Sequence, residues 1–213
     1  ATLEYLDGAT FRAARAGFPV DPPEGHGFLV VAEADGTEAG AAELRSELLE
    51  VLEDGAGLAH SPEGPKLIGD LWRWRDGVSI AVTAQQGGKV SEDIVVPVDR
   101  LSEAITGTDE IGRRHGLLTC SWGHAGDGNL HSTFMVARDD IDGLQRAEEA
   151  AIELFQLALD LGGTVSGEHG IGIAKSAGLG VQMTDAEIKL HQEIKACVDP
   201  KGLMNPGKKL PRA

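Results

Sequence analysis

Two histidines flank a predicted tight turn in residues 123–131. Asp127-Gly128 is a preferred pair for a two-residue hairpin loop, and this loop would place His124 directly opposite His131. Directly opposed residues share a sheet face, with Cβ atoms about 5 Å apart. Two imidazoles at that separation can bind one metal ion. The competing interpretation is a tight turn with two surface histidines.

A second candidate segment, residues 163–172, follows a predicted helix and contains four glycines in ten residues. Such a stretch permits unusual backbone angles and the close approach of a ligand. It also places Glu168 beside His169. Two histidines and one carboxylate with open coordination positions are a common catalytic metal set. A glycine-rich surface loop with charged ends is the alternative. A dinucleotide loop is excluded, because that pattern needs a preceding strand and an opening helix.

Arg75 is the third candidate. On a predicted helix over residues 66–83 it shares a stripe with Ile68, Trp72 and Ser79, where an apolar side chain is expected. A cation at such a position either extends its charge to solvent or binds a carboxylate at a pocket. The sequence leaves both interpretations open.

The segments that carry these residues form a predicted α+β chain. Apolar runs bounded by turn residues predict strands, and apolar residues at helical spacing predict helices. The predicted strands are 3–6, 27–34, 94–98, 117–122 and 130–137, and the predicted helices are 10–16, 37–54, 66–83, 101–114, 142–161 and 184–198. This order favours a ferredoxin-like antiparallel sheet with helices packed on one face.

Composition excludes several classes of protein. The 213 residues carry a net charge of −15, which argues against nucleic acid as a partner. The uncharged apolar runs are too short to span a membrane. Cys120 and Cys197 are too few and too far apart for a disulfide framework, so we expect a reducing, cytoplasmic setting.

Three motifs lie within the last 90 or so residues of the chain. They are Gly-His-x-Gly-Asp-Gly-Asn-x-His at 123–131, Ser-Gly-Glu-His-Gly-x-Gly at 166–172 and Asp-Pro-x-Gly-x-x-Asn-Pro-Gly-Lys at 199–208. Together they resemble the C-terminal domain of FAD-linked oxidases of the vanillyl-alcohol-oxidase type. The resembling branch includes D-lactate dehydrogenase, the glycolate oxidase flavin subunit and D-2-hydroxyglutarate dehydrogenase. Weaker similarities extend the resemblance over nearly all of residues 1–213.

The resemblance implies a role for each matching residue. His124, His131 and Glu168 would bind a divalent metal, zinc in many members, and His169 would be the general base on the substrate hydroxyl. The remaining implied roles are substrate binding by Arg75, Ser79, Lys89 and Asn129, and an approach to the flavin ring by Asn205.

The activity implied by the resemblance is oxidation of a D-2-hydroxy acid of the lactate, glycolate or 2-hydroxyglutarate type. The substrate carboxylate would lie on Arg75 and its hydroxyl on the metal, while His169 removes the proton and hydride passes from C2 to FAD. Residues 1–213 would be the substrate or cap domain, joined to an FAD-binding domain in cis or in trans. We expect the chain alone to be inactive and unable to hold FAD tightly. Its oligomeric state stays open, with a homodimer as one candidate.

Two functions of other classes fit part of the pattern. An independent zinc hydrolase would use the same ligands, with His169 activating water, but it leaves Arg75 and the motif around Asn205 without a role. A non-catalytic interaction module needs none of these residues. It predicts that His131→Ala changes neither metal content nor stability.

Overall fold

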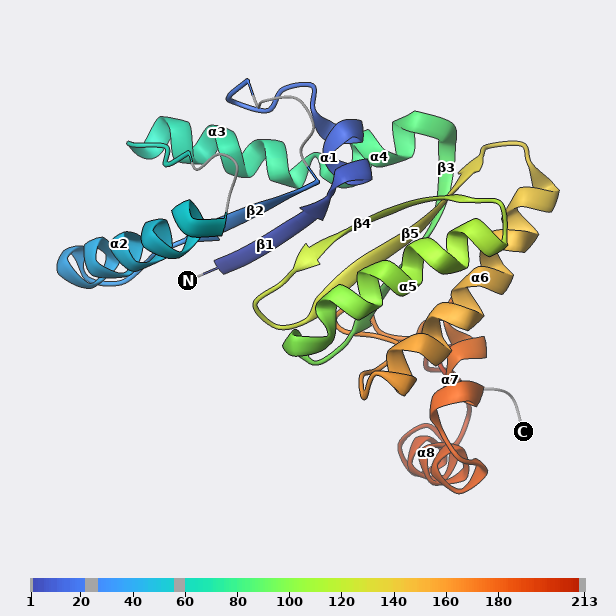
Figure 1. Ribbon diagram of the computed structural model, residues 1–213. Helices are drawn as coiled ribbons and strands as arrows, with labels where there is room; N and C mark the ends of the chain where they lie inside the picture. The colour runs from blue at the N-terminus through green and yellow to red at the C-terminus, as the bar shows by residue number, and fades with distance from the viewer. Residues whose placement is uncertain (1, 22–26, 56–59, 211–213) are drawn as a thin grey trace.

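The computed structural model describes residues 2–21, 27–55 and 60–210, which are built around one antiparallel sheet (Figure 1). Its strands lie in the order β2-β1-β4-β5-β3, and each neighbouring pair is antiparallel. The strands are β1 (Thr2–Asp7), β2 (Phe28–Glu33), β3 (Gly87–Val95), β4 (Leu118–His124) and β5 (Asn129–Ala137). The α+β class and the antiparallel sheet predicted from the sequence are confirmed.

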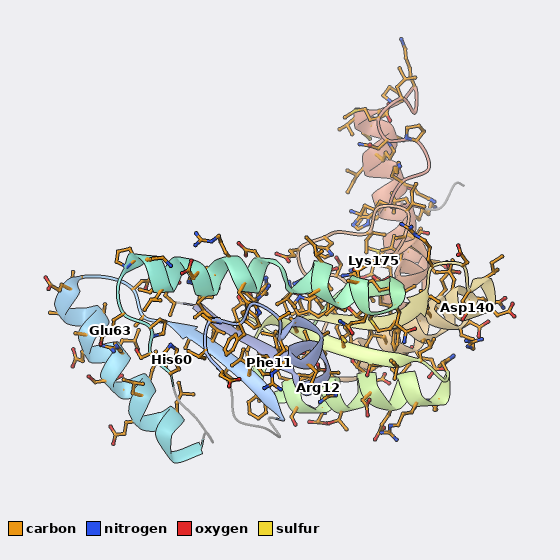
Figure 2. The ribbon with its side chains drawn as sticks, turned by 90° about the horizontal axis from the view of Figure 1, so that it is seen from above. Phe11, Arg12, His60, Glu63, Asp140 and Lys175 are labelled. Carbon is orange, nitrogen blue, oxygen red and sulfur yellow. The ribbon has the colours of Figure 1, made fainter. Side chains whose placement is uncertain are left out.

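Helices cover both faces of this sheet. The helices are α1 (Gly8–Ala14), α2 (Glu38–Gly55), α3 (Pro65–Asp76), α4 (Val78–Gln86), α5 (Leu101–Arg114), α6 (Ile141–Asp160), α7 (Ser176–Gln182) and α8 (Asp185–Val198), with a 3₁₀ turn at Val98–Arg100. Figure 2 shows α3 and α4 on one side of the sheet and α5 on the other. The prediction that the helices pack on one face is therefore wrong.

Two hydrophobic cores explain the two helical layers. Phe134 on β5 belongs to the core beneath α5 and α6, whereas the next residue, Met135, belongs to the core with α1 and α4. Successive strand residues point to opposite faces, and both of these are large and apolar. Each face therefore needs a cover. Trp122 joins Met135 in the second core.

The predicted helix over 66–83 is two helices in the structure. Gly77 separates α3 from α4, and its N–H donates to the carbonyl of Trp74 at 3.0 Å. Glycine is the poorest helix former after proline, so the break falls where the sequence is weakest. Ser79 consequently lies on α4 and Arg75 on α3, so the prediction that one helix carries both is wrong.

The third strand also differs from its prediction. β3 begins at Gly87, seven residues before the predicted start at Ile94, and pairs with β5 from Gly87↔Ala137 to Val95↔Asn129. Apart from Val90, its residues before Ile94 are glycine and polar residues, which give little apolar signal. Val98, predicted to end the strand, begins the 3₁₀ turn. The short helix α7 was not predicted.

The β4–β5 hairpin has a longer turn than Asp127-Gly128 predicts. His124 pairs with Asn129, and Trp122 pairs with His131, so residues 125–128 form the turn. The prediction that His124 lies directly opposite His131 is wrong by two residues. An even shift keeps side chains on the same face, so the two histidines still point the same way.

Neighbouring segments hold this longer turn. The N–H of Gly126 donates to the carbonyl of Leu3, and the carbonyl of Gly128 accepts from the N–H of Val96, both at 3.1 Å. Gly128 has φ +79°, and a Cβ there would lie 2.0 Å from the Val96 carbonyl oxygen. Tertiary contacts therefore override the local preference for a two-residue loop.

The C-terminal helix follows its prediction closely. α8 begins after Thr184, whose side chain accepts the N–H of Glu187, and the Glu187 carboxylate accepts the N–H of Thr184 in return. This is the capping box that the sequence predicts. None of the helices in the described ranges is long and apolar enough to cross a membrane.

Candidate active site

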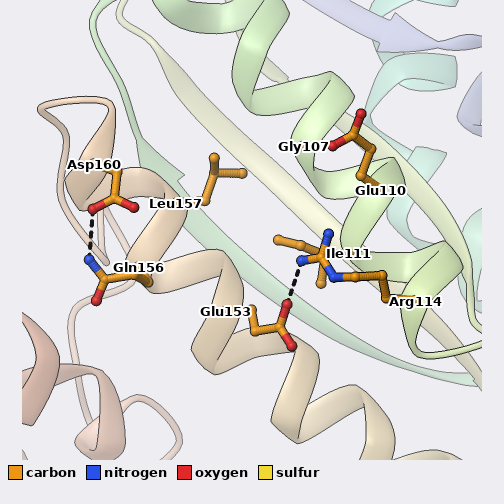
Figure 3. Close-up of a pocket in the computed structure, with 8 residues that line it drawn as sticks. All are labelled: Gly107, Glu110, Ile111, Arg114, Glu153, Gln156, Leu157 and Asp160. Atoms are coloured by element: carbon orange, nitrogen blue, oxygen red, sulfur yellow. Dashed lines mark hydrogen bonds and ion pairs between the residues drawn. The ribbon is translucent and has the colours of Figure 1, made fainter.

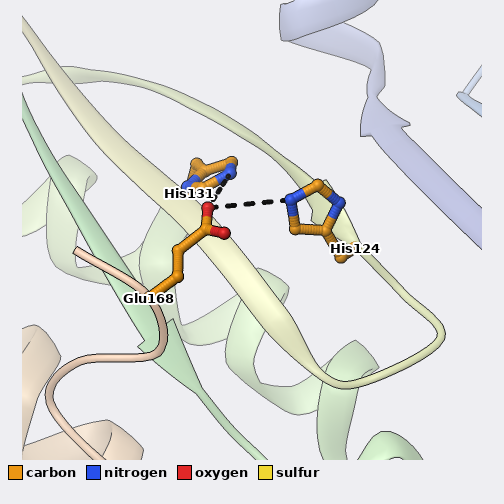
Figure 4. A group of neighbouring side chains, drawn as sticks. All are labelled: His124, His131 and Glu168. Atoms are coloured by element: carbon orange, nitrogen blue, oxygen red, sulfur yellow. Dashed lines mark ion pairs between the residues drawn. The ribbon is translucent and has the colours of Figure 1, made fainter.

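Three possible metal ligands from three segments converge on the sheet face that carries α1 and α4 (Figure 4). His124 ends β4, His131 lies on β5, and Glu168 lies in the loop after α6. The Nε2 atoms of the two histidines each lie 3.7 Å from Oε1 of Glu168, and all three ligand atoms lie within 4.8 Å of one another. A tetrahedral ion with bonds of about 2.0–2.1 Å needs ligand atoms roughly 3.4 Å apart. Small side-chain movements would meet that requirement.

The surroundings of His131 favour its neutral form. Burial lowers the pKa of His131 to about 4, and the positive charges of His124 and His169 act in the same direction. A cation binds a neutral imidazole, so this histidine is in its ligand form at neutral pH. Its ring lies 5.7 Å from that of Trp122 and is stacked on that of His169, with ring centroids 5.4 Å apart.

A buried carboxylate holds the backbone that carries Glu168. Asp93 on β3 is 0% exposed, and its Oδ2 accepts the N–H groups of Gly167, Glu168 and His169 at 3.1, 2.7 and 2.8 Å. Its Oδ1 is paired with the ammonium of buried Lys175. Three consecutive N–H donors on one carboxylate oxygen leave this loop little freedom to move relative to the sheet.

The glycines of this loop permit close contact with the protein's own strand. A Cβ on Gly163 would lie 1.9 Å from the carbonyl oxygen of Val95, and one on Gly167 would lie 2.7 and 2.8 Å from the side chains of Val95 and Asn129. Thr164 pairs with Val95 in an isolated bridge. Close approach was predicted, but at these two positions the approaching group is β3 and Asn129 rather than a ligand.

His169 lies beside the three ligands and is half exposed. Its Nδ1 is 3.5 Å from Oδ1 of Asp93, and its Nε2 is 3.7 Å from Oε1 of Glu168. Nδ1 therefore faces Asp93, and Nε2 faces the ligand group. The predicted base is therefore adjacent to the predicted ligands.

Arg75 lies next to the ligands as well, through a carboxylate that the sequence did not reveal. Glu4 on β1 accepts from Nε and Nη2 of Arg75 at 3.0 and 2.5 Å, and its other oxygen lies 2.6 Å from Nδ1 of His124. The Arg75 side chain is only 12% exposed. The alternative in which it extends its charge to solvent is therefore wrong, and two of its three nitrogens are engaged by Glu4.

Ser79 and Lys89 meet each other on the same face. The Lys89 ammonium donates to Oγ and the carbonyl of Ser79 at 2.6 and 3.1 Å, and it lies 5.1 Å from the centre of the Trp122 ring. Burial lowers the pKa of Lys89. Lys89 is four residues from Asp93 along β3, which separates their backbones by about 13 Å. Trp122 lies between Lys89 and His131.

The last two predicted residues differ in their surroundings. Asn129, opposite His124 in the hairpin, is 5% exposed, and its Oδ1 has no hydrogen-bond partner among the described residues. Asn205 lies in the exposed segment after α8 with φ 46°. It is not part of the ligand group.

A pocket of about 300 Å³ lies between α5 and α6, on the opposite side of the sheet (Figure 3). Four of its polar side chains pair with one another, as Arg114–Glu153 and Gln156–Asp160. The lining residues are Gly107, Glu110, Ile111, Arg114, Glu153, Gln156, Leu157 and Asp160. None of the predicted site residues is among them.

Sequence reasoning missed three buried charged residues of the site: Glu4, Asp93 and Lys175. Glu4 shares its sheet face with Leu6, so an acid stands where the strand pattern expects an apolar side chain. The reasoning that singled out Arg75 could have found it. Nothing in the sequence marks Asp93 and Lys175 as buried, because no strand or helix is predicted for the segments that carry them.

Comparison with known proteins identifies the family of this chain. The family model described as FAD linked oxidases, C-terminal domain, matches residues 1–209. The chain is 28% identical over 209 residues to the glycolate oxidase subunit GlcD of Bacillus subtilis (strain 168), covering 98% of this chain and 44% of that protein. It is 31% identical over 193 residues to D-lactate dehydrogenase of Anaerostipes hadrus, covering 83% and 40%.

A solved structure shares the fold. The 4-ethylphenol oxidase from Gulosibacter chungangensis, in complex with isoeugenol, aligns with a TM-score of 0.65 over 100% of this chain and 48% of that one. At 13% sequence identity this likeness shows the fold alone. The chain spans less than half the length of the curated relatives it matches.

Proposed function

The chain belongs to the family described as FAD linked oxidases, C-terminal domain, and from this membership we propose its function. The chain is the substrate- and cation-binding part of a flavin-dependent dehydrogenase or oxidase of D-2-hydroxy acids. The observation that carries the proposal is the convergence of two histidines and a carboxylate beside a free imidazole and a buried arginine. Relatives named for glycolate and D-lactate support a 2-hydroxy acid as the substrate class.

The donor set fits a divalent cation of the zinc type. Two imidazole nitrogens and one carboxylate oxygen leave a coordination position for a substrate oxygen. The low pKa of His131 keeps that ligand neutral, and the carboxylate of Glu4 orients the ring of His124. When bound, the cation would stabilise negative charge on the substrate oxygen, and FAD would accept the hydride.

The chain's own residues would supply binding and proton transfer. The positive charges of Arg75 and Lys89 on one sheet face attract the substrate carboxylate. The orphan Oδ1 of Asn129 offers an acceptor in the same region. The hydroxyl proton would move to Nε2 of His169, whose Nδ1 side faces Asp93.

The flavin would be held by a second domain, joined in cis or in trans. The described residues contain no glycine-rich loop between a strand and an opening helix, since the glycine-rich segment follows α6 and lies against β3. Asn205 would approach the flavin ring at the junction. We also propose a reducing, cytoplasmic setting, in which Cys120 and Cys197 stay free thiols. A homodimer is the proposed assembly.

Elemental analysis of the purified chain tests the cation site. We expect about one equivalent of divalent metal, its loss in His131→Ala, and its retention in the control His60→Ala, an exposed histidine outside the site. With the flavin-binding domain present, D-lactate or glycolate should reduce an acceptor dye, and His131→Ala should abolish this.

Three outcomes would contradict the proposal. Ester or peptide hydrolysis by the chain alone would favour the independent hydrolase. Unchanged metal content and stability in His131→Ala would favour the interaction module. The third outcome is a wild-type chain that binds no metal, although the chain together with a flavin-binding domain still oxidises hydroxy acids. The cation would then be dropped from the proposal, and the flavoenzyme would remain.

A further inference from the structure

Glu4 is a buried carboxylate that joins two halves of the candidate site. It lies directly opposite His124 in the β1–β4 pairing and is 3% exposed. Its Oε2 accepts two N–H groups of Arg75, and its Oε1 lies 2.6 Å from Nδ1 of His124. One side chain therefore contacts both a predicted cation ligand and the predicted anion-binding arginine.

Arg75 approaches one oxygen of this carboxylate only as a hydrogen-bond donor. The guanidinium is always charged and donates two hydrogen bonds to one Glu4 oxygen, at 3.0 and 2.5 Å. An ionised carboxylate can only accept hydrogen bonds. With Glu4 as the acceptor on both sides, Nδ1 of His124 is the donor of the second contact, at 2.6 Å.

This tautomer leaves the other ring nitrogen of His124 with its lone pair. That nitrogen, Nε2, is the atom that lies 3.7 Å from Oε1 of Glu168. A carboxylate on the far nitrogen of a metal-binding histidine fixes the ring, selects the tautomer and raises the basicity of the ligand atom. The contacts of Glu4 with His124 have this arrangement.

We propose that Glu4 is a positioning residue, which sets the tautomer and orientation of His124 for cation binding and orients Arg75 with its second oxygen. The inference rests on the cation site of the proposed function. It predicts that the cation-binding and anion-binding halves of the site are weakened by the same substitution.

The tautomer can be measured without any metal. Long-range ¹H–¹⁵N correlation spectra of the histidine-labelled chain distinguish a proton on Nδ1 from one on Nε2. In the wild type we expect His124 to be protonated at Nδ1. In Glu4→Gln the amide can either accept from Nδ1 or donate to it, so we expect both tautomers. A structural role alone would not move this signature in a folded variant.

Cobalt titration measures the consequence for binding. We expect the dissociation constant for Co²⁺, followed by its visible absorption, to rise about 10- to 100-fold in Glu4→Gln. Glu33→Gln is the matched control, since Glu33 is a half-buried acid on the neighbouring strand β2, opposite Thr2. It should leave both the tautomer and the affinity unchanged.

A second pair of variants covers the case in which Glu4→Gln fails to fold because Arg75 loses its partner. Arg75→Met alone should keep the Nδ1 tautomer of His124, whereas Arg75→Met combined with Glu4→Gln should show both tautomers. Glu4 variants with the wild-type tautomer, or with the wild-type cobalt affinity, would overturn this inference alone. A wild-type chain that binds no Co²⁺ would overturn the cation site of the proposed function and this inference with it.

Discussion

At the level of single residues, the site depends on buried charges that neutralise one another. Asp93 and Lys175 are both almost fully buried and are paired, and Asp93 also accepts three N–H groups from the loop that carries Glu168. A buried ion pair adds little net stability compared with apolar residues, but removing one member leaves an uncompensated charge. The role of the pair is therefore to hold the loop in one position.

This asymmetry predicts the effect of breaking the pair. Asp93→Asn should lower the free energy of unfolding by about 3 kcal/mol, because buried Lys175 loses its nearer carboxylate and keeps only Glu92, at 3.6 Å. Combining it with Lys175→Met should recover part of that loss, since both charges of the pair are then gone and only Glu92 loses its partner. Urea unfolding of the four proteins measures the coupling. A single variant within about 1 kcal/mol of the wild type would contradict this account.

The two cysteines should differ sharply in reactivity. Burial raises the pKa of Cys120 to about 11, with the negative charge of Asp7 adding to the effect, whereas Cys197 is exposed. The thiolate is the reactive form and appears only as the pH approaches the pKa. At pH 8 a disulfide reagent should therefore label one thiol per folded chain and two after denaturation. Cys197→Ser is the control and should abolish labelling of the folded chain.

At the scale of elements, local patterns predict which segments are helices and strands but not how they are joined. The helix at 101–114 is predicted to the residue, because its apolar spacing is clear and Gly116 follows it. The break at Gly77 and the polar start of β3 escape prediction, since tertiary contacts decide them. The histidine motif identified the ligands despite the wrong register, because a two-residue error preserves the face.

The β4–β5 turn offers a sharp test of how the hairpin positions the histidines. Gly128→Ala should cost about 2 kcal/mol or more, because φ is +79° and the new Cβ would lie 2.0 Å from the carbonyl oxygen of Val96. Gly126→Ala is the matched control in the same turn, where the nearest atom is Leu3 Cβ at 3.6 Å. Thermal unfolding and metal content should separate the two variants. Equal stabilities would show that the turn relaxes freely.

At the scale of the whole molecule, the two faces of the sheet have different tasks. The face beneath α5 and α6 is a closed apolar core, whereas the other face combines the core around Trp122 with the cluster of buried charges and histidines. All three predicted ligands come from this chain. The match covers less than half the length of relatives that include a glycolate oxidase subunit. Cation binding and flavin binding should therefore be separable properties.

This separation leads to a prediction for the 213-residue chain by itself. After incubation with Co²⁺ and FAD and then gel filtration, it should retain about one equivalent of Co²⁺ and no flavin, because its described residues supply a ligand set but no phosphate-binding loop. Without a hydride acceptor it should not oxidise D-lactate, although His169 and Arg75 are in place. His131→Ala should lose the cobalt and should likewise retain no flavin. Stoichiometric flavin that co-elutes with the chain would show that this chain binds the cofactor unaided. The proposal that cation and flavin are bound by different domains would then be wrong.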